Sequence, residues 1–394
     1  MSDITLSSPM APATTAPRDP EHGPQHGPEI TARPPRVDAP RIVEIGPTGY
    51  MHAAFPQTTT FFSTWPDETR TDPAQGRHVP TFGTLPDLAA RLADPDLDLV
   101  VVHAPASAPW SLRALGRTLF RRSVLHGALP LARALAPQLV RRRVAAPLAV
   151  LDFDDPAVID RGNAFLLDRA VAYFKRELPA DHWQAFTGTL HWRVPTPRFR
   201  RVAKNRRRME TLVPLSLGVP LEVFARPLPE VVPEAEKTAD IFWAGRVKDS
   251  STVRETGLGE LLALRDHGIV VDVPDAPLPL DAYLARMARA RLVWTPEGYG
   301  WQCFRLYESA LCGSVPLANQ PSIARHAPLL QGEHALYYDV EPGGLARAVR
   351  AALADRAGLA RIAAAGRAHV LAHHTPPAIA RHVVATALRL AAAR

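Results

Sequence analysis

Residues 293–319 bring together residue types that suit a phosphate-bearing ligand. Gly298 and Gly300 follow an apolar run, and Arg305 and Glu308 stand three apart in the helical segment after them. Glycine lets the backbone approach a ligand closely, and a helix N-terminus offers unpaired N–H groups and a positive dipole end. Arginine can bind a diphosphate bidentately, and glutamate can accept hydrogen bonds from a ribose diol. The spacing favours a nucleotide diphosphate; a connecting loop with an ordinary ion pair is the alternative.

The elements that must position these residues alternate between strand and helix from residue 239 onward. This rhythm predicts a parallel sheet covered by helices on both faces. In such a sheet, ligands bind beyond the carboxyl ends of the strands. In chain order we predict a strand in ADIFWAGR, a helix in STVRETGLGELLALRDHG that ends at Gly268, a strand in IVVDVP, a helix in LPLDAYLARMARAR and a strand in LVWTP.

The amino-terminal half shows a similar alternation. RIVEIG reads as a strand that leads into a tight turn, and the apolar runs at Leu99–His103 and in PLAVLD read as strands buried on both faces. Residues 110–146 are helical by period and strongly basic. The segment 157–178 is predicted to be a helix that carries Lys175 and Arg176, which could contact a phosphate or the acceptor but better fit an exposed helix face.

Length and composition indicate two domains with separate cores. The chain has 394 residues, which suits two domains, and its first 38 residues hold many of its forty prolines and no apolar period. We therefore expect a disordered tail. The fold class predicted is α/β, with two doubly wound Rossmann-like domains facing a cleft. The predicted parts are a tail at 1–38, an amino-terminal domain at 39–218, a linker at 219–238 and a carboxyl-terminal domain at 239–394.

Charge and cysteine content narrow the class of protein further. The net charge of +7 is concentrated in arginine clusters such as RTLFRRSVLH and RFRRVAKNRRR, which attract phosphates or form a solvated basic surface. Cys303 and Cys312 are spaced for neither a disulfide nor a zinc site, so reduced thiols are expected. The first residues lack a basic start followed by an apolar stretch, so a secretory signal is not expected, and the chain has no apolar run of about eighteen residues. We expect a cytoplasmic protein, whose basic helices fit peripheral contact with an inner membrane surface or normal packing.

The segment PEGYGWQCFRLYESALCGSVPL at 296–317 resembles the donor site of GT-B-fold glycosyltransferases. It is most similar to the exostosin-like and spore-maturation-type groups, and FWAGR at 242–246 resembles the first strand of the same domain. The likeness covers roughly residues 239–385. It implies that Glu308 binds the ribose, that Arg305, Arg246 and Lys248 contact the diphosphate, and that the donor site also includes Gly298, Tyr299 and Gly300.

One departure from the best-known retaining pattern leaves the stereochemistry open. That pattern places two glutamates eight apart, whereas Glu297 and Glu308 stand eleven apart in this chain. An inverting enzyme needs a general base for the acceptor hydroxyl, usually a carboxylate or a histidine.

The amino-terminal half has three sites at strand ends that are expected to face the acceptor, and the candidate bases lie among them. They are the turn Gly46–Tyr50, His103 after an apolar run, and the aspartates of DFDDP at 152–156. His103 could equally cap the edge of a core. An Asp-x-Asp could hold a divalent cation, but Asp155 before proline reads better as a helix N-cap, so Asp152 is kept as the candidate base and no metal or other cofactor is expected.

The resemblance implies transfer of a sugar from a nucleotide-diphospho-sugar to a glycan, lipid-linked or small-molecule hydroxyl acceptor, with the domains closing to exclude water. The transfer of a hexosyl group in cell-surface glycan or glycoconjugate synthesis is the expected setting. A catalytically inactive GT-B scaffold is the alternative, because no base is unambiguous in the first half. A nucleic-acid-binding protein is a further alternative, but a stacking-aromatic module or helix-turn-helix is lacking, so only weak, non-specific binding is expected.

Overall fold

The molecule is represented by a computed structural model, which describes residues 38–65, 71–105, 124–142, 144–191, 194–199, 203–248 and 250–394. The expected tail up to residue 37 and much of the basic segment 110–146 lie outside this described part. Residues 35–394 form one compact unit that contains two large sheets.

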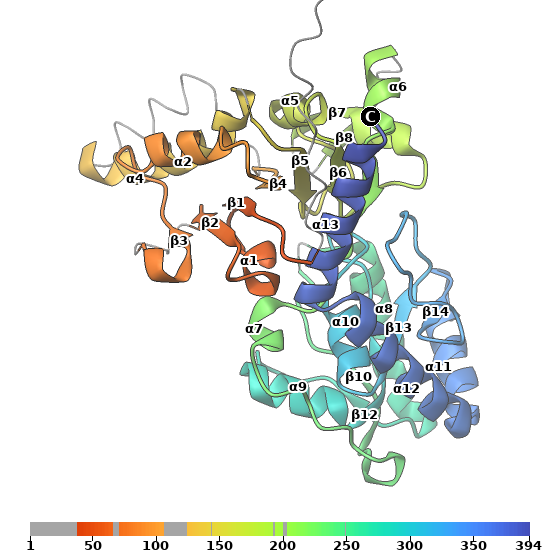
Figure 1. Ribbon diagram of the computed structural model, residues 1–394. Coiled ribbons are helices and arrows are strands. Elements are labelled where there is room, and N and C mark those ends of the chain that lie inside the picture. Colours follow the sequence, from red (N-terminus) through yellow and green to blue (C-terminus); the bar gives the residue numbers. More distant parts are fainter. Residues whose placement is uncertain are drawn as a thin grey trace, which may run out of the picture. The chain divides into compact units, whose positions relative to one another are not determined.

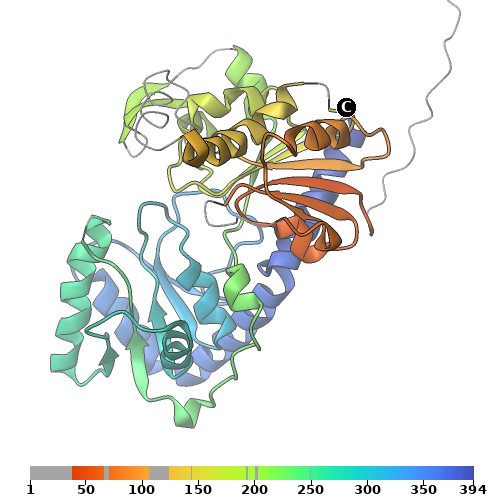
Figure 2. The same cartoon turned by 90° about the vertical axis from the view of Figure 1, so that its left-hand side faces the viewer.

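The first sheet has seven parallel strands, which Figure 2 shows side by side in red to green. Continuous apolar runs form its middle because these strands are covered on both faces. The sequence predictions for RIVEIG, Leu99–His103 and PLAVLD are confirmed. In sheet order the strands are β3 (Arg77–His78), β2 (Thr59–Ser63), β1 (Ile42–Gly46), β4 (Leu99–His103), β5 (Leu148–Asp152), β6 (Ala172–Lys175) and β9 (Leu212–Pro214).

Helices cover both faces of this sheet. On one face Val43, Ile45 and Val100 pack with Leu88 and Leu92 of α2, and on the other Ile42 and its neighbours pack with α1 and α13. An antiparallel hairpin stands apart from the sheet. The elements are α1 (Tyr50–Ala54), α2 (Leu85–Leu92), α4 (Val124–Leu135), α5 (Ala164–Leu167), β7 (Thr187–His191), β8 (Val194–Phe199), α6 (Ala203–Met209) and α7 (Leu221–Phe224).

The prediction of a helix over 157–178 is wrong. Only short helical turns occur before residue 168, and Ala172–Lys175 is strand β6, which lies between β5 and the edge strand β9. The parallel register places Lys175 directly opposite Asp152 of β5, and its side chain is fully buried. Local periodicity could not predict this strand. The buried Lys175 is stabilised by Asp152, which lies on another strand.

Asp155 does not cap a helix, in contrast to the expectation. Residues 153–160 form an irregular loop after β5, and the Asp155 carboxylate pairs with the Arg176 guanidinium at 2.7 Å. The Asp-Pro dipeptide resembled a helix start, but the ion pair to the end of β6 determines where this carboxylate lies.

The second sheet has five parallel strands, as the rhythm after residue 239 predicted. Helix α8 begins after Ser251, whose hydroxyl accepts the N–H of Arg254, and a turn of 3-10 helix then ends at Gly268 in the left-handed conformation with φ of 75°. In sheet order the strands are β11 (Val271–Asp272), β10 (Ala239–Phe242), β12 (Ala290–Trp294), β13 (Val315–Asn319) and β14 (Leu336–Tyr338), and the helices are α8 (Thr252–Ala263), α9 (Leu280–Ala288), α10 (Phe304–Leu311), α11 (Gly344–Ala354), α12 (Arg356–His373) and α13 (Pro376–Ala392).

The glycine-rich segment lies where the sequence placed it. It connects β12 to α10 at the carboxyl end of the second sheet, and Gly313 ends that helix with φ of 74° before β13. The strand, loop, helix and strand predicted for 293–319 are therefore confirmed.

The last helix returns to the first sheet. Ile379, Val383 and Leu388 of α13 pack with α1 and with the strands β4, β5 and β6, and Figure 1 shows this blue helix beside α1 and β6. The predicted domain at 239–394 thus includes a helix whose core contacts are with the amino-terminal sheet. In the described ranges, no helix is long and apolar enough to cross a membrane.

Candidate functional site

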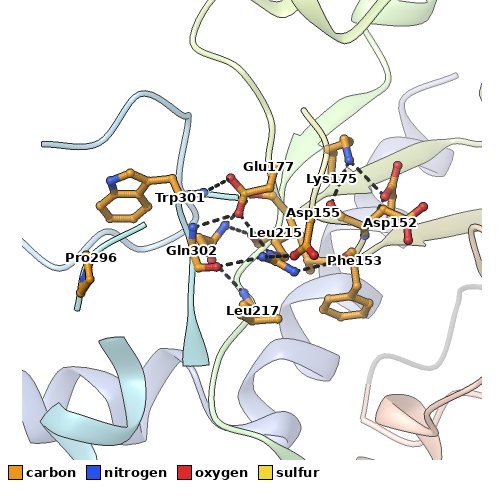
Figure 3. Close-up of polar contacts among 12 residues, drawn as sticks. Asp152, Phe153, Asp155, Lys175, Glu177, Leu215, Leu217, Pro296, Trp301 and Gln302 are labelled. Carbon is orange, nitrogen blue, oxygen red and sulfur yellow. Dashed lines mark hydrogen bonds and ion pairs between the residues drawn. The ribbon is translucent and has the colours of Figure 1, made fainter. Parts of the chain in front are cut away.

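The loop between β12 and α10 is held against the end of β6 by a buried carboxylate. Glu177 accepts the backbone N–H of Trp301 at 2.7 Å and that of Gln302 at 2.9 Å (Figure 3). Arg176 donates to Glu177, to Asp155 and to the carbonyl oxygen of Gln302. Burial raises the pKa of Glu177, and the charge of Arg176 and the two N–H donors oppose this rise. The loop is thereby positioned by residues of the first sheet.

Gln302 completes this connection with its side chain. Its Nε2 donates to the carbonyl oxygens of Arg176 and Leu215, and its Oε1 accepts from the N–H of Leu217 at 2.9 Å and from the hydroxyl of Tyr307 at 2.6 Å. All the hydrogen-bonding positions of this buried amide are satisfied. A fully satisfied buried network fixes geometry, so the loop has one defined position.

A cavity of about 280 Å³ opens in front of the glycine-rich loop. Arg246 lines it, whereas Lys248 is exposed and is not one of its lining residues. Gly298, Tyr299 and Gly300, which the resemblance assigns to a donor site, form part of the wall, and the other lining residues are Asp155, Arg176, Leu217, Ser250, Arg254, Gln302, Cys303 and Phe304.

Two further arginines lie in this region: Arg254 lines the cavity, and Arg305 on α10 is near Arg254 but is not one of the lining residues. Nε and Nη1 of Arg305 and Nε of Arg254 are buried, and these three nitrogens have no hydrogen-bond partner within the described part of the chain. Burial and the nearby charge of Arg305 lower the pKa of Arg254. Arg254 nevertheless donates to the carbonyl oxygens of Arg246 and Pro296, which orient it. Such a concentration of cations suits an anionic ligand.

The two glycines of the loop are required by close approaches within the protein. A Cβ on Gly298 would lie 2.7 Å from Nη2 of Arg254, and one on Gly300 would lie 2.6 Å from Cδ of Glu177. Gly298 therefore lets the Arg254 guanidinium lie against the loop, and Gly300 makes room for the anchoring carboxylate. These glycines were predicted to approach a ligand instead.

Glu308 and Arg305 lie on α10 but do not form an ion pair with each other. Glu308 is 6% exposed and accepts the hydroxyl of Tyr283 at 2.9 Å, while Nη2 of Arg305 donates to the carbonyl oxygen of Ala244. Burial raises the pKa of Glu308, and the Tyr283 hydrogen bond and the charge of Arg305 oppose the rise. Glu297, the other glutamate of the segment, accepts from the amide of Asn319.

A second cavity of about 550 Å³ lies at the carboxyl ends of β1, β4 and β5. His103 lines it at the end of β4, and Tyr50 and Phe153 contribute stacked rings 4.9 Å apart. Its remaining lining residues are Pro47, Thr48, Thr64, Ala104, Pro105, Arg133, Ala134, Pro137, Leu151, Asp154, Arg176, Leu217 and Phe304.

Asp152 is engaged in a buried network. Its carboxylate accepts from Tyr173 at 2.8 Å, from Lys175 at 3.1 Å and from the backbone N–H of Asp154 at 3.1 Å, and it is 2% exposed. Asp154, two residues on, lines the second cavity instead. Burial and the charge of Asp152 raise the pKa of Asp154 to about 6.

The two cavities share three lining residues, which are Arg176, Leu217 and Phe304. A ligand in the first cavity and a ligand in the second would therefore meet at these side chains. Phe304, at the start of α10, is 41% exposed there. In the described ranges, no group of three or more histidine, cysteine, aspartate or glutamate side chains is arranged to hold a metal ion.

Sequence reasoning found some residues of this region and missed others. The glycine pair, Arg246 and His103 line the cavities. Arg254, Glu177 and Gln302 were missed because their roles depend on contacts between separate segments, and Arg176 was considered but placed on a helix. The signal that could have found Glu177 was a lone acidic residue after the apolar run 170–174 and two basic residues.

A segment of the carboxyl-terminal region is similar to a known family. Residues 264–385 match the family described as glycosyl transferase-like. No curated protein matches the chain.

Two solved structures share the fold over nearly all of the chain. A glycosyltransferase from Rickettsia africae is 9% identical with a TM-score of 0.52, covering 90% of this chain and 99% of that one. Sucrose-phosphate synthase from Thermosynechococcus elongatus is 13% identical with a TM-score of 0.50, covering 90% and 100%. At these identities the likeness concerns the fold, which is GT-B. The predicted resemblance to GT-B-fold glycosyltransferases is confirmed, while the narrower exostosin-like or spore-maturation-type group stays a prediction.

Proposed function

We propose that this protein is a glycosyltransferase that moves a sugar from a nucleotide-diphospho-sugar to a hydroxyl acceptor. The observation that carries the proposal is the arginine cluster beside the 280 Å³ cavity, where nitrogens of Arg254 and Arg305 are buried without partners among the described residues. Burying unpaired charged donors is unfavourable for folding. A diphosphate bound in the cavity would supply the missing acceptors.

The donor would bind with its diphosphate against Arg246, Arg254 and Arg305. Its ribose would contact Glu308 through Oε1, the oxygen that does not bond Tyr283. As the bond to the sugar breaks, negative charge grows on the diphosphate, and fixed cations in a site of low water content stabilise that charge. Arg305 is fixed by Ala244 and Arg254 by Pro296, so little reorganisation is needed.

The acceptor would occupy the 550 Å³ cavity, with the transferred sugar at the shared residues Arg176, Leu217 and Phe304. An aromatic side chain and a leucine there suit the apolar face of a sugar ring. The proposal extends to a hexosyl group and to acceptors used in cell-surface glycan or glycoconjugate synthesis. Lys248 would contact the donor only from outside the cavity wall.

The test measures thermal stability with UDP, GDP, ADP, CMP, TDP and their sugars. A ligand at one hundred times its dissociation constant stabilises by about 2.7 kcal/mol. Arg305→Met should abolish the shift given by the nucleotide, because the diphosphate loses a charged donor. The matched control is Arg356→Met, on the surface of α12, which should keep the shift.

Three results would separate the alternatives. Binding with release of the nucleotide from a sugar donor supports transfer. Binding without any turnover, in the presence of glycan acceptors, would favour the scaffold. No shift with any nucleotide would remove the support that the arginine cluster gives to the proposal.

A further inference from the structure

A buried glutamate lies in the middle of strand β1, within an otherwise apolar run. Glu44 stands between Val43 and Ile45 in IVEIG and is fully buried. A buried carboxylate requires several hydrogen-bond donors to be tolerated. The identity of these donors therefore indicates what the residue does.

Three donors surround the Glu44 carboxylate. Its Oε1 accepts the backbone N–H of Met51 at 3.2 Å and lies 3.1 Å from Nε2 of His103, and its Oε2 accepts the backbone N–H of His52 at 3.0 Å. Backbone N–H groups can only donate, so both oxygens of the Glu44 carboxylate act as hydrogen-bond acceptors. The matching partner on His103 is an N–H group.

This arrangement determines the tautomer of His103. With the proton on Nε2 bonded to Glu44, a neutral imidazole carries its lone pair on Nδ1. The ring itself is held by packing, since a Cβ on Gly46 would lie 2.3 Å from Cγ of His103, and Tyr50 and Phe153 have ring centroids 6.3 and 5.9 Å away. The histidine lines the 550 Å³ cavity.

We propose that His103 is the general base for the acceptor hydroxyl and that Glu44 is the positioning residue that fixes its tautomer. This inference rests on the proposed function. Nδ1 of His103 takes the hydroxyl proton while the acceptor oxygen bonds to the anomeric carbon of the donor sugar. The bond from that carbon to the diphosphate breaks, and its electron pair leaves on the diphosphate oxygen beside the arginines. The direct displacement inverts the anomeric configuration.

The charged and titratable groups around this imidazole come from several elements. Glu44 faces it from β1 and Tyr50 from α1, and Arg133, Asp154 and Arg176 line the same cavity. Burial and the charge of Glu44 raise the pKa of Tyr50, so that its hydroxyl stays neutral and remains a donor. Asp154 is the competing base, whereas Asp152 is committed to Tyr173 and Lys175.

The first experiment reads the tautomer directly and needs no substrate. Two-dimensional NMR on protein with nitrogen-labelled histidine distinguishes Nε2–H from Nδ1–H imidazoles, and the His103→Gln variant identifies the signal. The wild type should show the Nε2–H form. In Glu44→Gln the amide N–H can donate to Nε2, which should move the proton to Nδ1. An Nδ1–H form in the wild type would overturn the inference.

The second experiment measures hydrolysis of the nucleotide sugars named in the stability test above, with water as the acceptor. Glu44→Gln and His103→Gln should each lower kcat by about 10²–10⁴-fold, the usual range for a general base, with the donor KM unchanged. In Glu44→Gln the remaining rate should rise with hydroxide concentration, because solvent then replaces the missing base. A merely structural role would lower the melting temperature and leave this pH profile unchanged.

His52→Gln is the matched control, since His52 also lies beside Glu44 but bonds the carbonyl oxygen of Gln75 through its ring. It should keep full turnover. Loss of turnover in Asp154→Asn alone, or a product with retained configuration, would overturn the inference while the proposed function stands. A wild type that turns over no sugar of the panel would overturn the proposed function and the role of His103 with it, whatever tautomer is observed.

Discussion

The Glu177 carboxylate, at the end of β6 in the first sheet, accepts the backbone N–H of Gln302 at 2.9 Å and so joins the glycine-rich loop of the second sheet to the first. The Gln302 side chain returns the contact by donating to the carbonyl oxygens of Arg176 and Leu215. These bonds are buried, and Glu177 bonds Trp301 as well. If the donor cavity closes around a ligand, residues 301–302 of the loop should therefore stay bonded to the end of β6.

Gly300→Ala should destabilise the protein through this contact. The new Cβ would lie 2.6 Å from Cδ of Glu177, so the carboxylate must move from the two N–H groups it bonds. Overpacking of this kind costs about 1–3 kcal/mol. Chemical denaturation measures the loss in free energy of unfolding.

The control is Gly259→Ala in the middle of α8, where a Cβ meets nothing within 4 Å. It should stabilise the protein by about 0.5–1 kcal/mol, because alanine is the better helix former. Equal effects of the two substitutions would show that the Gly300 contact is absent in solution.

How much of the site the sequence predicts depends on whether a residue acts locally. The Arg305–Glu308 segment was predictable because a strand, a glycine loop and a helix follow one another directly. Its helix end at Gly313 was predictable for the same reason. Asp155 was misread because a local cap signal competed with a partner, Arg176, that lies on another strand.

Residues whose roles come from strand register could not be read from periodicity. Lys175 looked like an exposed helical lysine, and only the pairing of β5 with β6 shows that it faces Asp152. Glu44 left a weak signal, a single acidic residue within an apolar run, which calls for a buried partner. The sequence could not indicate that this partner is His103, 59 residues away.

Lys175→Met should be strongly destabilising. Lys175 is fully buried and donates to Asp152 at 3.1 Å, so its loss leaves a buried carboxylate with only neutral partners. Removing one member of a buried ion pair costs about 3–5 kcal/mol. The free energy of unfolding in urea measures it.

The double variant Lys175→Met with Asp152→Asn provides the comparison. The amide that replaces the carboxylate keeps an acceptor for Tyr173 and carries no charge, so the double variant should be more stable than Lys175→Met alone. If the effects of Lys175→Met and of Asp152→Asn, each measured alone, simply add in the double variant, then Lys175 and Asp152 do not interact.

A cluster of histidines should make stability depend on pH in the acid range. Nε2 of His369 and Nε2 of His374 each lie 2.8 Å from the carbonyl oxygen of Ala327, a residue with φ of 39°, and His326 stacks on His382 at 3.7 Å. The pKa of His326 is lowered to about 4, mainly by burial and then by the charges of His382, His373 and His369. Burial lowers the pKa of His374 well below its ordinary value.

The sign of the pH effect follows from these lowered pKa values. Between the ordinary histidine pKa of about 6.5 and the folded value of about 4 for His326, the unfolded chain binds more protons, so stability falls as pH falls. Urea unfolding at pH 7.5, 6 and 5 should show this decline, and His326→Gln should make it shallower. His182→Gln, which lies outside the cluster, is the control and should leave the slope as in the wild type. An unchanged slope in His326→Gln would contradict the assignment of this pH dependence to the cluster.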